Sequence, residues 1–173
     1  MRLREAQIVC IGLAGGMLVA SVVMGGLAYA KVVNMIPGLL PPLAGAVALA
    51  FPACLLAGLA VRSSMLQQAR LAWLKDSDGR VGESIELFEA AYARAAYIQC
   101  AAFEGFGLLG AVAALFTGQL LFLAAPAIAI VGIGVAFPSE TKFRATTDAL
   151  TRPPDERELR LVEALRERDD ADA

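Results

Sequence analysis

Residues 97–118 read YIQCAAFEGFGLLGAVAALFTG, an apolar run long enough to cross the roughly 30 Å hydrocarbon core of a bilayer as one α-helix. One residue in the run does not fit a membrane span. Glu104 is the only formally charged residue between Arg94 and Glu140. The stretch therefore predicts a transmembrane helix, and it raises the question of why a carboxyl group lies inside it.

The composition of the whole chain also favours a membrane protein. Of the 173 residues, 58% are apolar and 18% are charged, and the mean hydropathy is +0.62. Soluble domains have about 45–50% apolar and about 25% charged residues. The charges cluster and leave apolar stretches near residues 8–30, 39–61, 95–117 and 119–137. We therefore expect an all-α membrane protein, with a bundle of four transmembrane helices in residues 1–144 that contacts the lipid bilayer.

The basic residues predict how the chain is threaded. Lys and Arg close to the ends of spans are retained on the cytoplasmic side. If both termini are cytoplasmic, each of the 15 basic residues except Lys31 lies on that side. This favours a multi-pass protein of the inner membrane with both termini inside. A second interpretation stays open, because AYAK at 28–31 has the small-x-small pattern of a signal-peptide cleavage site. Cleavage of residues 1–30 would leave three spans.

Two segments are expected outside the bilayer. Residues 62–94 have helical periodicity on both sides of the turn signal DSDGR at 76–80, which predicts a cytoplasmic helical hairpin standing on spans two and three. Residues 145–173 form a polar tail, in which 151–170 predict a helix capped by Thr151. That helix is either solvated or a docking helix, for another protein or for the hairpin.

A candidate polar site lies at similar depths of the membrane domain and consists of Glu104, Ser21, Pro52 and Pro126. Each proline lies near the middle of a span and lacks the N–H that would bond the carbonyl four residues before it. These prolines either produce tolerated kinks, or they free the carbonyls of Ala48 and Phe122 to accept hydrogen bonds from a protonated Glu104. Glu104 then either fixes how helices or copies of the chain assemble, or it binds and releases a proton or cation.

Small residues at every fourth position mark faces on which membrane helices approach closely. Three such ridges occur in this sequence: Gly12, Gly16 and Ala20; Ala46, Ala50, Cys54 and Gly58; and Gly110, Ala114 and Gly118. They predict a compact bundle. The contacts are open to three interpretations: within one chain, between copies in a homo-oligomer, or with a partner in a membrane complex.

Several classes of function are disfavoured by residues that the sequence lacks. It has no His, and Cys10, Cys54 and Cys100 lie in apolar stretches at unrelated spacings, so we expect no metal site, disulfide framework or cofactor. It has no Ser/His or Cys/His pair and no phosphate-binding loop, so we expect no enzyme. No basic patch alternates with aromatic residues, so we expect no nucleic-acid partner.

AAFEGFGLLGAVAALFTG at 101–118, followed by AFPSETKF at 136–143, resembles a set of uncharacterised small bacterial four-span inner-membrane proteins. These proteins have Ala-x-x-Glu-Gly in the third span and Phe-Pro-Ser/Thr-x-x-Lys after the fourth. The matching positions in this chain are Glu104, Gly105, Phe137, Pro138 and Lys142. The resemblance implies a four-span protein of the bacterial inner membrane, and it implies no activity.

Together these observations favour a non-catalytic membrane protein that acts as a structural or partner-binding component. The alternative is a small proton- or cation-coupled carrier, or a channel-like oligomer, that uses Glu104.

Overall fold

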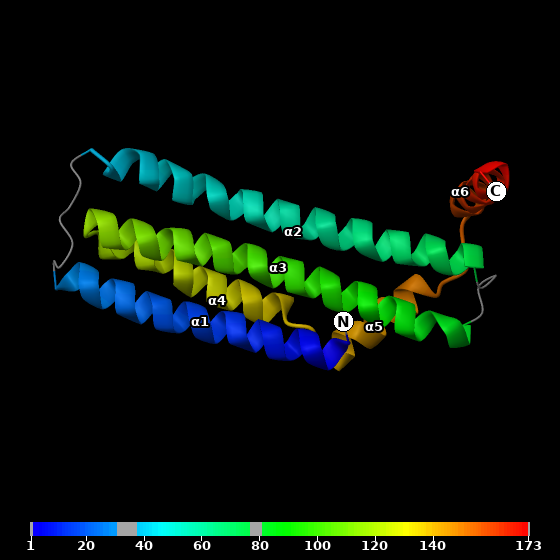
Figure 1. Cartoon of the computed structure of the whole chain (residues 1–173), viewed down its shortest axis with the longest axis horizontal. Helices are drawn as coiled ribbons and strands as arrows, with labels where there is room; N and C mark the ends of the chain where they lie inside the picture. The colour runs from blue at the N-terminus through cyan, green and yellow to red at the C-terminus, as the bar shows by residue number, and fades with distance from the viewer. Residues whose placement is uncertain (1, 31–37, 77–80, 173) are drawn as a thin grey trace.

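The computed structural model describes residues 2–30, 38–76 and 81–172, and nearly all of them are helical, with no strand among them (Figure 1). Lys31, the AYAK junction and the turn at Gly79 fall wholly or partly outside the described residues. The elements, in chain order, are α1 (Leu3–Tyr29), α2 (Leu40–Asp76), α3 (Val81–Thr117), the 3₁₀ helix η1 (Leu120–Leu123), α4 (Ala124–Ala136), α5 (Glu140–Leu150) and α6 (Glu156–Asp172).

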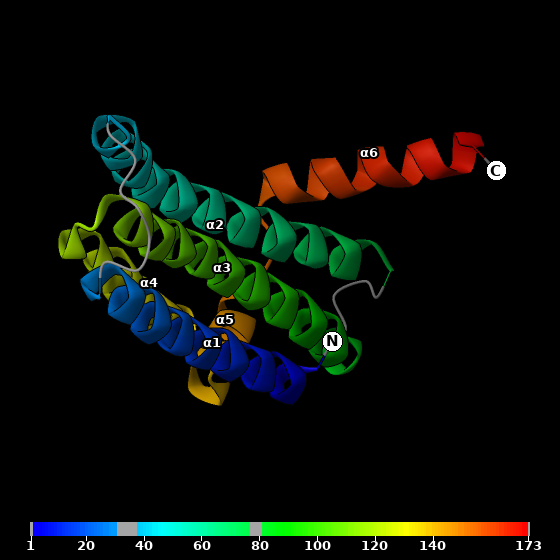
Figure 2. The same ribbon diagram turned by 60° about the vertical axis from the view of Figure 1, so that its left-hand side comes forward.

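Helix α3 is the centre of the bundle, because α1, α2 and α4 all pack against it. Figures 1 and 2 show α3 between α2 and α1, with α4 against α3 and α1. Glycines permit this close packing. A Cβ at Gly107 would lie 2.4 Å from Met17 Sδ and 2.9 Å from Ala129 Cβ, so no larger residue fits where α1, α3 and α4 meet.

Two of the three small-residue ridges face a neighbouring helix. In α2, a Cβ at Gly58 would lie 3.1 Å from Gln99 Cγ, and in α3, a Cβ at Gly110 would lie 2.4 Å from Ala125 Cβ. The ridge in α1 does not face a neighbour, since no atom comes within 4 Å of the Cβ positions of Gly12 and Gly16. The α1 ridge therefore makes no close helix contact within the chain at these two glycines, and contact with another copy or with a partner stays open for it.

Helices α2 and α3 are each 37 residues long, which is about 55 Å and well beyond the thickness of a hydrocarbon core. Both run without a break across the boundaries expected at residues 61 and 94. The helices of the predicted hairpin thus continue those of the apolar segments. Among the described residues, three single helices are long and apolar enough to cross a membrane, in the ranges Leu3–Tyr29, Leu40–Lys75 and Glu86–Thr117.

The fourth apolar segment, which the sequence predicts over 119–137, is helical over Leu120–Ala136, but its first turn is the 3₁₀ helix η1. Helix α3 ends at Thr117, and the next residue, Gly118, has a φ of +66°, a conformation that glycine adopts without strain. The chain then reverses, winds as η1 and continues as α4, which covers about 28 Å in total. A fourth candidate span combines η1 and α4 with α5 across a bend of 58°.

Pro126 therefore lies elsewhere in its helix than the sequence predicted. It is the third residue of α4, so the carbonyl four residues before it, that of Phe122, belongs to η1 and not to α4. Pro52, in contrast, lies inside α2 as expected.

The polar tail contains two helices instead of one. Thr151 is the C-cap of α5, and α6 begins only at Glu156, so the predicted cap is wrong. The cap of α6 is Asp155: its carboxylate accepts a hydrogen bond from the Glu158 N–H at 2.8 Å, and its own N–H donates to Glu158 Oε2 at 3.1 Å. The two prolines at 153 and 154 lie in the connection between α5 and α6.

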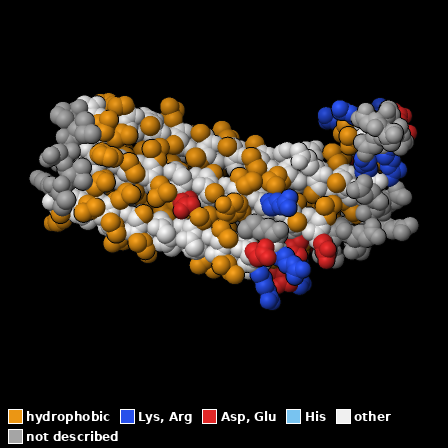
Figure 3. Space-filling view, viewed as in Figure 1, with side chains coloured by type: hydrophobic (Ala, Val, Ile, Leu, Met, Phe, Trp, Pro, Cys, Tyr) orange, Lys and Arg blue, Asp and Glu red, His pale blue; other side chains and the backbone are white. Residues whose placement is uncertain are grey.

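Most charged side chains gather at one end of the bundle. Figure 3 shows a surface dominated by hydrophobic side chains, with most charges toward the end at which α6 lies and one acidic side chain within the apolar part. Two bonds bring the start of α1 to this end: Leu3 N–H donates to Glu89 Oε1 at 2.8 Å, and Gln7 Nε2 donates to the Pro138 carbonyl at 2.8 Å.

Candidate functional site

The charged end of the molecule is organised around Arg70 of α2, which is only 3% exposed. Its Nε and Nη2 atoms donate to the two carboxylate oxygens of Glu158, each at 2.8 Å. Its Nη1 donates to the carbonyl of Leu150, and its Nη2 also donates to the carbonyl of Arg152 at 3.2 Å. One guanidinium thus holds the end of α5, the connection and the first turn of α6. We call these contacts the Arg70 clamp.

The carboxylate of the clamp is strongly biased toward its charged form. The hydrogen bonds from Arg70 are the main cause that lowers the pKa of Glu158 from 4.5 to about 2; burial opposes this, and the Asp155 N–H and the charges of Arg70 and Arg152 add to it. A planar guanidinium facing a carboxylate through two parallel hydrogen bonds is the strongest ion-pair geometry available to side chains. The pair is therefore a fixed connection and not a loose surface contact.

Helix α6 packs against α2 through a small apolar cluster. Val162 is buried with Ala69, Trp73, Leu74 and Phe88. The Trp73 and Phe88 rings meet edge to face, with centroids 5.6 Å apart. The sequence left open whether the tail helix is solvated or docked. In the structure it is docked, and it docks on the helical hairpin formed by the ends of α2 and α3.

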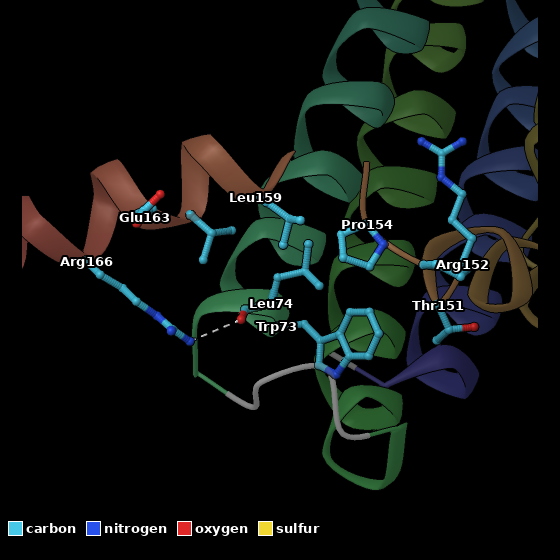
Figure 4. Close-up of a pocket in the computed structure, with 10 residues that line it drawn as sticks. Trp73, Leu74, Thr151, Arg152, Pro154, Leu159, Glu163 and Arg166 are labelled. Carbon is cyan, nitrogen blue, oxygen red and sulfur yellow. Dashed lines mark hydrogen bonds between the residues drawn. The ribbon is translucent and has the colours of Figure 1, made fainter. Parts of the chain in front are cut away.

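A cavity of about 560 Å³ lies where the connection and α6 meet the end of α2. Figure 4 shows Trp73, Leu74, Leu159 and Pro154 around it. Arg166 reaches from α6 to the end of α2, where its Nη2 donates to the Lys75 carbonyl at 2.7 Å and to the Leu74 carbonyl at 3.5 Å. These are carbonyls of the last turn of α2, which have no partner within the helix, so Arg166 also caps α2.

The four residues of the predicted polar site are not brought together. Ser21 and Pro126 line one groove between α1 and α4. The hydroxyl of Ser21 donates to the Met17 carbonyl of its own helix at 2.7 Å. Pro52 is exposed on α2, and Glu104 lies on α3, outside the groove that Ser21 and Pro126 line. The groove that holds Ser21 and Pro126 therefore contains neither Pro52 nor Glu104.

Glu104 is half-buried and has no hydrogen-bond or ion-pair partner among residues 2–30, 38–76 and 81–172. The acceptors expected for it are not used. Ala48 is exposed, and the Phe122 carbonyl lies over Gly110, 2.8 Å from the position of a Cβ there. Since Gly110 is six residues beyond Glu104 on the same helix, that carbonyl belongs to another level of the bundle.

The buried polar groups of the apolar part were not assigned from the sequence. Gln99 is 6% exposed and packs against Gly58, and its Oε1 has no hydrogen-bond partner among the described residues. The thiols of Cys10 and Cys100 are buried and lie 3.1 Å apart, joining α1 to α3. Cysteine spacing along the sequence gave no signal for this pair, because α1 and α3 meet only in the folded bundle.

The Phe-Pro-Ser-x-x-Lys motif forms the corner between α4 and α5. Pro138 is fully buried, and Ser139 caps α5 by accepting the Lys142 N–H at 3.3 Å. The Lys142 ammonium reaches back and donates to the carbonyls of Val135 and Phe137, at 2.7 and 3.3 Å. A cation at the C-terminal end of a helix is favoured by the helix dipole. The motif thus has a structural role in this chain.

The chain matches no protein-family model, and neither a curated protein nor a solved structure is similar to it. The function therefore has to be argued from the geometry. No group of three or more His, Cys, Asp or Glu side chains that could hold a metal ion occurs in the part of the chain that the structure describes.

Proposed function

We propose that this chain is a non-catalytic, multi-pass protein of a bacterial inner membrane, with both termini in the cytoplasm, that presents a helical platform to a protein partner. The platform consists of the ends of α2 and α3 beyond the apolar segments, together with α5 and α6. The distribution of charge supports this placement, since the charged side chains gather where these helices lie (Figure 3).

The Arg70 clamp is the observation on which the proposal rests. It fixes the first turn of α6 to α2, Val162 and Arg166 add contacts to α2 further along, and the C-terminal end of α6 extends away from the bundle (Figure 2). A tail that only had to be soluble would need no buried ion pair, because fixing a tail costs conformational entropy at every ordered residue. The fixed helix also displays apolar side chains: Leu159 is 52%, Leu161 44% and Leu165 38% exposed. A rigid helix with exposed leucines is suited to binding another protein.

The polar groups of the apolar part support a non-transporting role. Ion pathways through membranes use polar side chains that line a continuous cavity. In this chain, Ser21 bonds its own helix, Gln99 is buried against α2, and Glu104 lies apart from both. The groove that Ser21 lines, between α1 and α4, contains neither Gln99 nor Glu104.

The test is site-specific photo-crosslinking in native membranes. A photoreactive amino acid at Leu161 should give one discrete adduct with a second protein. Arg70→Ala should reduce that adduct at least about fivefold, because α6 is no longer fixed. The matched control is the same probe at Val131, an exposed position of α4, where Arg70→Ala should change nothing. A Leu161 probe that yields no protein adduct, or an adduct that does not depend on Arg70, contradicts the proposal.

A proton- or cation-coupled carrier is the second candidate, and one observation favours it: Glu104 is half-buried and has no partner among the described residues. The chain reconstituted in vesicles would then dissipate a pH gradient, and Glu104→Gln would abolish that flux. The absence of a flux above that of empty vesicles eliminates this candidate.

A further inference from the structure

One side of α3 is left uncovered by the bundle. Its neighbours α1, α2 and α4 cover the sides that carry Cys100, Gln99 and Phe103. The remaining side is a stripe of exposed and half-buried residues at helical spacing, which consists of Tyr97, Ala101, Glu104, Gly105 and Leu108. We call it the open stripe. Figures 1 and 2 show why it stays open: α1 and α2 flank α3 and are joined only through it over most of their length.

The open stripe has room for another helix backbone at the level of Glu104. A Cβ added to Gly105 would have no atom within 4 Å, whereas one added to Gly107 would collide with Met17. Ala101, one turn before Glu104, and Gly105, next to it, are both small, so another helix backbone can come close to the carboxyl on that part of the stripe. Small residues beside a polar one allow both close packing and a hydrogen bond between membrane helices.

Nothing in the described chain can satisfy the Glu104 carboxyl. Gln99 points to α2, where it packs on Gly58, and Ser21 lies between α1 and α4. The sequence places no Lys, Arg or His in the apolar stretches near residues 8–30, 39–61, 95–117 and 119–137. Acyl chains offer no hydrogen-bonding group either. An unsatisfied carboxyl in such surroundings is costly, which favours a partner beyond the described residues.

We propose that a second copy of this chain covers the open stripe, and that the two Glu104 carboxyls hydrogen-bond to each other. The inference rests on the membrane placement given under the proposed function. Copies in one membrane share one orientation, so a two-fold axis along the membrane normal brings each residue of the stripe to its own counterpart at the same depth. A neutral carboxyl has one donor and one acceptor, which makes two of them mutually complementary.

This arrangement answers why the apolar segment carries a single carboxyl with no complementary group in the sequence. A partner of a different kind would need a donor placed at the same depth by another sequence, whereas symmetry supplies the partner without any further residue. Arg94 lies on the same side of α3, ten residues before Glu104 and toward the charged end. Its charge there is screened by water and salt, so the two copies of Arg94 oppose pairing only weakly.

The first arm of the test is cysteine cross-linking in lipid vesicles. Gly105→Cys, oxidised with copper phenanthroline, should give the disulfide-linked dimer as the main product. Gly134→Cys is the matched control, because Gly134 is also an exposed helical glycine with no atom within 4 Å of its Cβ, but it lies on α4. Its yield of cross-linked dimer should not exceed that of the wild type, which carries three cysteines of its own. Equal cross-linking at both positions, or none at Gly105, overturns the proposal.

The second arm measures the hydrogen bond by energy transfer between labelled copies at increasing lipid dilution. Glu104→Leu should weaken association about 3- to 30-fold, the range expected for one interhelical hydrogen bond. Glu104→Gln should stay within about twofold of the wild type, because an amide also donates and accepts. Association that survives Glu104→Leu unchanged overturns the carboxyl pairing. A cross-link between Glu104 and a basic residue of another protein would also overturn it, because that protein would then be the partner.

Alkaline extraction of native membranes separates the two failures. If carbonate releases the chain from the membrane, the proposed function is contradicted. The proposed dimer is then contradicted as well, because it depends on the membrane placement. A chain that stays in the membrane but is monomeric at every dilution contradicts the dimer alone.

Discussion

The guanidinium of Arg70 and the carboxylate of Glu158 lie 88 positions apart in the sequence and form two hydrogen bonds of 2.8 Å each. The side chain of Arg70 is 4% exposed and that of Glu158 is 14% exposed, so water competes little for either group. By comparison, Arg144 and Glu140 also form an ion pair at 2.7 Å, but both are more than 70% exposed. Because the Arg70–Glu158 pair is buried, it is this pair that fixes the tail.

Removal of Arg70 should release α6. Arg70→Ala leaves the Glu158 carboxylate with only the Asp155 N–H and the more distant Arg152 guanidinium, at 3.7 Å, and it frees the carbonyls of Leu150 and Arg152, which should cost about 3 kcal/mol of docking free energy. Hydrogen exchange of the amides of α6 should then accelerate by about two orders of magnitude. Arg144→Ala is the matched control and should leave the exchange of α6 unchanged, because its ion pair is solvated. Slow exchange of α6 in Arg70→Ala would show that the clamp does not hold the helix.

Acid should undock α6 in a defined pH range. The folded pKa of Glu158 lies below the usual value, at about 2 instead of 4.5, because Arg70 stabilises the carboxylate. Such a group contributes stability fully above pH 4.5, and the contribution is lost as the pH falls toward about 2. Trp73 is the only tryptophan of the chain and lies in the apolar cluster with Val162, so its fluorescence should report the loss. We expect its emission to shift to the red between these pH values.

Glu158→Gln is the control for the acid transition. The amide that this substitution introduces cannot titrate, so the variant should show a red-shifted, loosely docked state already at neutral pH and no transition in that range. The same transition in the wild type and in Glu158→Gln would assign it to another carboxyl group.

The sequence predicted the long helices well but could not predict which of their sides face inward. Hydropathy and length identify α1, α2 and α3, because a chain must bury apolar runs of this length. In an apolar helix, however, the inner and outer sides carry the same residue types, so periodicity does not distinguish them. For this reason Glu104 was recognised as exceptional, while its position on the open stripe and its missing acceptors were not.

The clamp and the 3₁₀ start of the fourth apolar segment were not predicted, for other reasons. Arg70 and Glu158 each resemble ordinary solvated residues of a helix, and only the fold brings them together across 88 positions. In the fourth segment, the chain reverses at Gly118 and winds first as the 3₁₀ helix η1, so α4 begins only at Ala124. Pro126 thereby becomes a residue of the first turn of α4, a part of a helix in which proline is common.

Enlargement of Gly110 should destabilise the bundle. A Cβ at this position would lie 2.4 Å from Ala125 Cβ and 2.8 Å from the Phe122 carbonyl oxygen, and backbone atoms cannot move aside as a flexible side chain can. Gly110→Val should therefore cost at least about 2 kcal/mol, measured as a lower thermal midpoint in detergent. Gly12→Val is the control at a helical glycine with no atom within 4 Å, and it should change the midpoint little. Equal losses in both variants would contradict the packing of α3 against η1 and α4.

Oxidation should join Cys10 to Cys100 and leave Cys54 free. The two sulfur atoms lie 3.1 Å apart, about 1 Å more than the length of a disulfide bond, so a small shift of α1 against α3 closes the bond. A membrane-permeant two-electron oxidant such as diamide should take up the two thiol hydrogens, and the disulfide should form within one chain. Maleimide labelling after unfolding should then modify one cysteine instead of three, and reduction should restore all three.

The identity of the labelled residue makes this experiment a test of the register between α1 and α3. Peptide mapping should find the maleimide on Cys54, which lies on α2 and is only half-buried. If α1 were shifted along its axis by one turn, Cys10 would lie about 5 Å from its present level, beyond the reach of Cys100. Label on Cys10 or Cys100, or a disulfide that includes Cys54, would therefore contradict the packing on which the open stripe of α3 depends.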